Sequence, residues 1–155
     1  MQDTFQLIAR AQAEYARCID DGDLTDWPDF FVGECVYKVT TAENHKRGLE
    51  AGLIYAASRG MLVDRIASLR DANIYERHAY RHLLGQPYIV SESDDEVRSE
   101  TSFMVARIMR DGTTSLFVTG RYLDVYVRHE NSVKLRERIA VCDSSRIDTL
   151  LALPL

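Results

Sequence analysis

The second half of the chain is a succession of strand-like runs joined by tight turns, and this pattern constrains the fold most. Four runs are rich in β-branched and aromatic residues: residues 80–91, 97–109, 114–127 and 132–143. Residues 110–113 contain Asp-Gly, a strong hairpin signal, and residues 129–131 form a second short link. Pro87 cannot donate to a strand ladder, so the first run is interrupted, bulged or at an edge. The pattern predicts an antiparallel meander.

The first half of the chain is predicted to be mainly helical. Apolar residues recur at helical spacing over residues 4–20, and Gly22 suits the stop of this helix. Residues 24–31 indicate a short second helix with Asp26 as its cap and Pro28 in its first turn. Residues 61–69 indicate a third helix, with the strand-like run 34–41 before it.

Helices followed by a meander indicate one α+β domain over residues 1–155. Residues 41–60 mix glycines with charges and predict no element clearly. The apolar end of the chain, Leu150 to Leu155, is expected to pack onto the domain, because an exposed tail of this kind is unusual.

Both faces of the run at residues 116–127 carry bulky side chains. Alternation places Leu116, Val118, Tyr122 and Tyr126 on one face and the next set on the other: Phe117, Leu123, Val125 and Val127. Helices can cover one of these faces. The second is either covered by another subunit or is the ordinary mixed surface of a curved sheet.

The bulk properties of the sequence exclude some classes of partner. The formal net charge of −5 argues against nucleic acid, since phosphate binding needs a basic face. No run approaches the roughly 18 apolar residues of a membrane span, and the first residues show no signal-peptide pattern. Cys18, Cys35 and Cys142 form an odd, widely spaced set, which is typical of reduced thiols in a cytoplasmic protein.

The segment "ERHAYRH", residues 76–82, is the densest group of candidate functional residues. His78 and His82 share a face in a helix or a strand, and Glu76 could complete a two-histidine, one-carboxylate iron site. Arg77 and Arg81 oppose this interpretation, because their positive charge would repel a cation nearby. The sequence therefore favours a structural or interface role over a metal site.

An acid/base site is a second interpretation. In a small cone of helices and curved sheet, burial can shift the pKa values of residues that line a pocket. The candidate lining residues are Tyr15, Tyr37, Asp64, His78, His82 and Asp124. Eight tyrosines in a domain of this size are more often packing residues than catalysts.

A charged docking surface is the third interpretation of this segment. Arginine offers a rigid fork of donors and is enriched at interfaces, as are aromatic residues. The candidate interface residues are Tyr75, Arg77, His78, Tyr80, Arg81 and His82. The alternative is a solvated basic strand, paired within the chain with acids such as Glu137.

Several stretches resemble the small (beta) subunits of bacterial aromatic-ring-hydroxylating, or Rieske, dioxygenases. They occur in family order from about residue 15 to residue 155: "WPDFF", "CVYKVT", "GLEAGLIYA", "MLVDRIASLRDANIYERHAYRHLLG", "FMVARIM", "RERIAVCDS" and "DTLLALPL". "RDANIYERHAYRHLLG" and "ERIAVCDS" are the most specific. The resemblance implies an NTF2-like fold, a cone of N-terminal helices against a strongly curved, mostly antiparallel sheet.

The resemblance also implies that the redox centres lie in a partner. In this family the large (alpha) subunit carries a Rieske 2Fe–2S cluster and a mononuclear non-haem Fe(II), and the small subunit is structural in an α3β3 assembly. Electrons come from NAD(P)H through a reductase, and the ring of an aromatic acid is cis-dihydroxylated, with terephthalate as the expected substrate. We therefore expect no catalytic, cofactor-binding or metal-binding residues in this chain.

The cysteines support this division of labour independently. A Rieske centre needs cysteine and histidine in paired CxH and CxxH clusters. Cys18 is followed two residues on by Asp20, Cys35 by Tyr37, and Cys142 by Ser144. No histidine closely follows any cysteine, which excludes a Rieske site in this sequence.

Two other classes remain open at this point. One is a stand-alone lyase or isomerase that uses the same cone to enclose an acid/base pocket. The other is a homo-oligomeric protein that binds small molecules. A cone filled by aromatic and aliphatic side chains would favour the subunit, and a wet cavity with converging polar groups would favour the enzyme.

Overall fold

The computed structural model describes residues 3–50, 52–72, 78–144 and 153–155. The helical elements are α1 (Thr4–Asp20), the 3-10 helix η1 (Trp27–Phe30), α2 (Ala42–Lys46) and α3 (Arg59–Ala72). The strands are β1 (Phe31–Thr41), β2 (Ile54–Ala56), β3 (His78–Leu84), β4 (Tyr88–Glu92), β5 (Glu96–Met109), β6 (Thr114–His129) and β7 (Ser132–Cys142). The α+β prediction is therefore confirmed.

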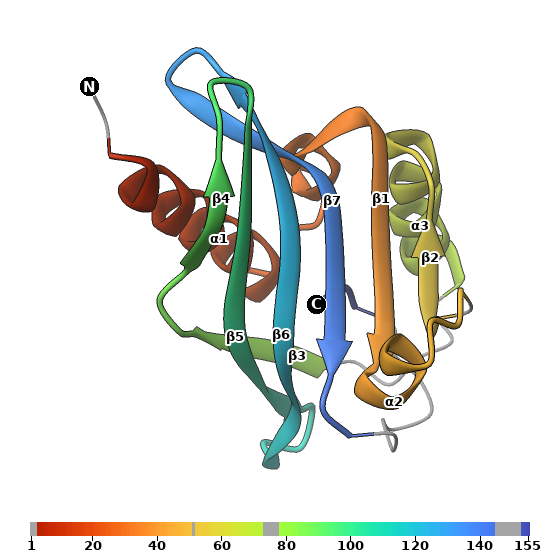
Figure 1. Ribbon diagram of the computed structural model, residues 1–155. Coiled ribbons are helices and arrows are strands. Elements are labelled where there is room, and N and C mark those ends of the chain that lie inside the picture. The colour runs from red at the N-terminus through yellow and green to blue at the C-terminus, as the bar shows by residue number, and fades with distance from the viewer. Residues whose placement is uncertain (1–2, 51, 73–77, 145–152) are drawn as a thin grey trace.

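One mixed sheet organises the molecule. Its strand order is β2-β1-β7-β6-β5-β3, and β4 also pairs with β5. β1 and β7 are parallel, and the other pairs are antiparallel. Figure 1 shows the sheet bending so that β3 runs crosswise to β1 and β7, with α1 and α3 behind the strands. The long strands β5, β6 and β7 form the predicted meander.

Most of the predicted local signals are confirmed. The first helix spans Thr4–Asp20, and Gly22 follows it with a φ of 82°. Gly112 adopts a φ of 91° in the hairpin between β5 and β6, a conformation that glycine tolerates without strain. Pro87 lies in the break between β3 and β4, as the missing N–H requires. The segment at Asp26 forms a 3-10 turn instead of an α-helix, and the Asp26 side chain makes no capping bond.

The concave face of the sheet holds the core. Ile8, Tyr15 and Ile19 of α1 are buried there, as are Leu62 and Ile66 of α3. Aromatic rings from η1 and β1 meet edge to face: the Trp27 and Tyr37 centroids lie 5.2 Å apart. Such pairs add stability beyond the area they bury. Packed aromatic rings therefore fill the interior of the cone next to η1 and β1.

A bulge in β6 corrects one part of the predicted alternation. The register shifts between Val105 and Ala106 of β5, which pair with Val118 and Leu116. The extra residue, Phe117, stacks on the buried Tyr80 with 5.5 Å between centroids. Leu116 consequently lies on the convex face and is 62% exposed, although alternation had placed it with Val118. The prediction that both faces carry bulk is confirmed for the rest of the strand.

The end of the chain packs as expected where the structure describes it. Leu153, Pro154 and Leu155 are buried, and residues 150–152 lie outside the described part. Cys35 and Cys142 are buried free thiols, whereas Cys18 is half-buried. No helix among the described residues is long and apolar enough to cross a membrane.

Candidate functional site

β3 places only part of the predicted interface segment on the surface. Tyr75 and Arg77 lie outside the described residues, as does Glu76. Side chains alternate along the strand: Tyr80 and His82 are buried in the interior, whereas Arg81 is exposed on the convex face. His78 is half-buried. The interface hypothesis for the described residues therefore narrows to Arg81 and its neighbours.

His82 ties β3 to the end of α1. Its Nδ1 lies 2.7 Å from Oδ1 of Asp20, and its backbone N–H donates to Oδ2 of the same carboxylate at 2.8 Å. The His82 side chain is fully buried, and its Nε2 has no hydrogen-bond partner among the described residues. Among the described residues, no three His, Cys, Asp or Glu side chains cluster as a metal site would require.

The structure brings three of the predicted acid/base residues together, Tyr15, Tyr37 and Asp124, around Arg138 in the packed interior. Asp64 is exposed on α3, so its assignment to the lining of a pocket is wrong. Asp124 instead accepts two hydrogen bonds from Arg138, from Nε at 2.9 Å and from Nη2 at 2.8 Å. These residues are register partners on β6 and β7, so the ion pair follows from strand pairing.

Burial keeps the interior tyrosines protonated. The Arg138 guanidinium lies between two rings, 4.2 Å from the centroid of Tyr15 and 3.8 Å from that of Tyr122. Desolvation raises the pKa of Tyr37 and of Tyr122 well above the ordinary value, although the Arg138 charge opposes the rise at Tyr122. Groups held in this way are poor proton donors or acceptors near neutral pH. This part of the interior favours a packed subunit over an acid/base enzyme.

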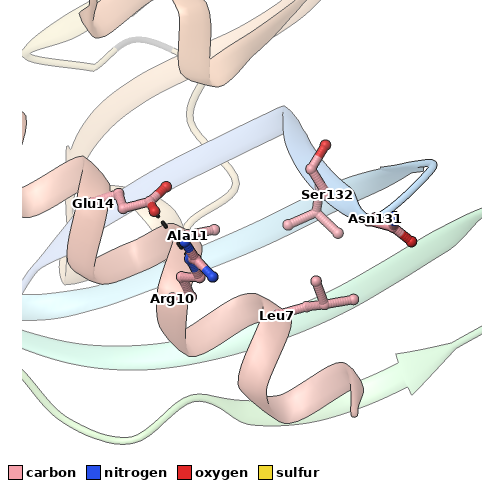
Figure 2. Close-up of a pocket in the computed structure, with 7 residues that line it drawn as sticks. Leu7, Arg10, Ala11, Glu14, Asn131 and Ser132 are labelled. Carbon is pink, nitrogen blue, oxygen red and sulfur yellow. Dashed lines mark hydrogen bonds and ion pairs between the residues drawn. The ribbon is translucent and has the colours of Figure 1, made fainter. Parts of the chain in front are cut away.

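A surface hollow between α1 and the turn before β7 has a volume of about 630 Å³. Figure 2 shows its lining, with Arg10 and Glu14 on successive turns of the helix and Asn131 and Ser132 across from them. Arg10 Nε and Glu14 Oε1 are 3.1 Å apart and are both well exposed. An exposed pair of this kind contributes little energy. The described residues that line the hollow do not form a catalytic arrangement of side chains.

The convex face of the sheet has the composition of a docking surface. One cross-strand row runs through Lys38, Ile139, Leu123, Glu100 and Tyr88, which are register partners from β1 to β4. A hollow of about 250 Å³ lies on this face around the apolar Leu123, Val125 and Ile139. The charged residues Arg98, Glu100 and Glu137 also line this hollow. An apolar centre with a charged rim is typical of protein interfaces.

A second apolar area on the same face surrounds Arg81. Register pairs place Leu83 opposite Met104, and Arg81 opposite Ala106, which in turn pairs with Leu116. Leu83 is 58% exposed, Met104 40% and Leu116 62%. We call Arg81, Leu83, Met104 and Leu116 the outer patch. In the described part of the chain, no helix crosses β5, β6 or β7 on the face viewed in Figure 1.

The sequence did not single out three of these four residues. The sequence predicts Leu83 and Met104 only as strand residues, and alternation places Leu116 on the opposite face. Arg81 alone was a predicted interface residue. The available signal was the count of bulky residues on both faces of the strands, which indicated an interface without locating it.

The fold is that of an NTF2-like protein, and comparison with known proteins defines the family. A proposed scytalone dehydratase from Novosphingobium aromaticivorans shares the fold, with a TM-score of 0.70 and 16% identity over 96% of this chain and 90% of that one. The model of the ring hydroxylating beta subunit family matches residues 14–149. The chain belongs to this family: it is a small subunit of an aromatic-ring-hydroxylating oxygenase.

The relatives are beta subunits of oxygenases. The chain is 50% identical to the terephthalate 1,2-dioxygenase terminal oxygenase component subunit beta 1 from a Comamonas species, over 96% of both proteins. It is 35% identical to the anthranilate 1,2-dioxygenase small subunit from Burkholderia cepacia, over 96% of this chain and 92% of that one. The beta subunit of a proposed aromatic-ring-hydroxylating dioxygenase from N. aromaticivorans superposes with a TM-score of 0.89 at 38% identity, over 97% and 96% of the chains.

Proposed function

We propose that this chain is the non-catalytic, structural small subunit of an oxygenase that acts on terephthalate. The identity of 50% to a terephthalate 1,2-dioxygenase beta subunit, against 35% to an anthranilate small subunit, is the observation that carries the substrate. The packed interior around the Arg138–Asp124 pair supports a structural role for this chain.

The reaction of the whole enzyme is a cis-dihydroxylation. Terephthalate, O2, NAD(P)H and one proton give a cis-dihydrodiol dicarboxylate and NAD(P)+. Both oxygen atoms become hydroxyl groups on ring carbons, and the nucleotide supplies two electrons. We place the Rieske 2Fe–2S cluster and the mononuclear non-haem Fe(II) in the large subunit. A reductase would deliver the electrons to it.

A beta subunit of a multi-subunit oxygenase requires an alpha-subunit partner, and we propose an α3β3 assembly. The convex face of the sheet is the surface proposed for contacts with the large subunit or with other copies of this chain. Its exposed leucine and methionine side chains, with Arg81 among them, support this assignment. Tyr75 and Arg77 are proposed as further interface residues.

A cytoplasmic location is proposed with this function. The chain holds three free cysteines, which a reducing compartment would preserve. NAD(P)H, the proposed electron source, is also a cytoplasmic reductant.

Co-expression with a large subunit of the terephthalate type tests the proposal. We expect the two chains to co-purify, and the complex with its reductase to oxidise terephthalate at least tenfold faster than anthranilate at equal concentration. The isolated chain should bind no stoichiometric iron and should oxidise neither acid. Stoichiometric iron on the isolated chain would refute the structural role. Equal rates for the two acids would refute the substrate assignment.

A further inference from the structure

The last residue of the sequence is held inside the cone by two tyrosines. The Tyr15 hydroxyl donates a hydrogen bond to the Leu155 oxygen at 2.7 Å, and the Tyr37 hydroxyl donates to the same oxygen at 3.2 Å. The N–H of Leu155 donates to the Tyr37 oxygen at 2.9 Å. Leu155 is fully buried. Two phenol donors on one oxygen are an arrangement that would hold the carbonyl or carboxyl group of a bound ligand.

Two further donors flank the same tyrosines. The Trp27 and Arg138 side chains are buried and hydrogen-bond the Tyr15 hydroxyl, which opposes the rise in its pKa that burial causes. Arg138 is the register partner of Tyr37 across β7 and β1, and its guanidinium lies over the Tyr15 ring. The Trp27 ring packs against the Tyr37 ring. This end of the interior therefore gathers four buried donors, of which two bond the Leu155 oxygen.

The charge and shape of this region limit the ligand that it would accept. Arg138 is neutralised by Asp124, and burial keeps Tyr15 and Tyr37 uncharged by raising the pKa of each. Leu153 and Leu155 belong to the same buried cluster as Trp27. A small molecule with a branched apolar body and one carbonyl or carboxyl group would reproduce the contacts of Leu155.

We propose that this region, formed by Tyr15, Trp27, Tyr37 and Arg138, is a binding site for small apolar carbonyl compounds, and that residues 153–155 occupy it as an intramolecular ligand. A tethered ligand acts at an effective concentration of about millimolar, so a weakly binding free compound displaces it only when present well above that concentration. The site is thus closed while residues 153–155 occupy it and opens when they leave. This inference is independent of the oxygenase assembly.

A chain that ends at residue 152 tests the proposal directly. With its fold verified by circular dichroism, we expect it to bind 4-methylpentanamide or 4-methylpentanoate at least tenfold more tightly than the full chain does, by calorimetry. Tyr37→Phe in the shortened chain should weaken that binding at least fivefold. Tyr55→Phe, at an exposed tyrosine of β2, is the matched control and should leave it unchanged. The two compounds distinguish a neutral carbonyl site from a carboxylate site.

A folded shortened chain that binds neither compound better than the full chain does would overturn the proposal. If the shortened chain fails to fold, release of Leu155 from the full chain by a carboxypeptidase decides. Saturating 4-methylpentanamide or 4-methylpentanoate should then speed the release severalfold by displacing the tail, with no effect on a free peptide substrate. Unchanged release with both compounds would show that the tail is only a packing segment.

Discussion

The two faces of one sheet carry charge among apolar side chains in opposite ways. On the concave face, Arg138 and Asp124 are fully buried, joined by two hydrogen bonds and enclosed by tyrosine rings. On the convex face, Arg81 is exposed beside Leu83, and the Arg121–Glu100 pair is exposed with 4.0 Å between its charged atoms. The concave face pairs its buried charges within the chain, whereas the convex face leaves apolar area uncovered in the single chain.

This difference separates the contacts that stabilise the isolated chain from those that stabilise its assembly with a partner. Breaking a polar contact on the concave face should change the stability of the isolated chain. Changing the convex face should leave that stability intact and weaken assembly. Each of the following experiments tests one side of the comparison.

The largest effect is expected for Asp124→Asn. It leaves the Arg138 charge buried without a counter-charge, which should lower the free energy of unfolding by about 3–5 kcal/mol in a urea titration. Glu100→Gln, at the exposed pair on the other face, should change it by about 0–1 kcal/mol. Equal losses for the two variants would contradict the comparison.

Tyr37→Phe should have the next largest effect. It removes the hydroxyl that both donates to the Leu155 oxygen and accepts from the Leu155 N–H, so the unfolding free energy should fall by about 1–3 kcal/mol. Tyr55→Phe, at an exposed site, should stay within about 0.5 kcal/mol of the parent chain. A Tyr37→Phe chain as stable as the Tyr55→Phe control would show that these bonds do not hold the tail.

Leu83→Ser tests the convex face. We expect at least a tenfold loss of affinity for the large subunit, equivalent to about 1.4 kcal/mol, measured by titration of one subunit into the other. The stability of the isolated chain should not change, because Leu83 is 58% exposed. Val63→Ser, at a similarly exposed position on α3, is the control and should assemble normally. Normal assembly of Leu83→Ser would remove the outer patch from the interface.

A pH titration probes the concave face through Cys142. Burial raises the pKa of this thiol from 9.0 to about 12. Above pH 9 the unfolded chain loses the proton that the folded chain keeps, so this group's contribution to stability is complete below pH 9 and is lost between pH 9 and 12. Between pH 8 and 10 the unfolding free energy of Cys142→Ala should fall by about 1 kcal/mol less than that of the parent. Parallel profiles would show that the thiol does not contribute.

The smallest effect is expected for the Arg77→Ala, Arg81→Ala double variant. It should weaken assembly a few-fold through lost polar contacts and leave the isolated fold intact, since surface charges contribute little to folding. Co-purification yield and binding affinity are the measurements. Unchanged affinity would mean that these arginines form only a solvated or internally paired patch.

Local sequence signals predicted much of the fold because they act over a few residues. The apolar stripe of α1, the Asp-Gly turn near Gly112 and the break at Pro87 each depend on neighbours along the chain. The short elements α2 and β2 were not predicted, because β2 has only three residues and gains its stability by pairing with β1. The candidate site was predicted less well, since faces and partners depend on strand register.

The order of the elements, the tight turns, the apolar periodicity and the family resemblance can all be inferred from the amino-acid sequence. Three contacts become visible only in the folded chain: Asp124 pairs with Arg138, His82 meets Asp20 across 62 residues, and Leu155 reaches Tyr37 across 118. Periodicity reports which side of an element is apolar. Register, the bulge at Phe117 and the bending of the sheet decide what that side meets, and they arise only when distant strands pair.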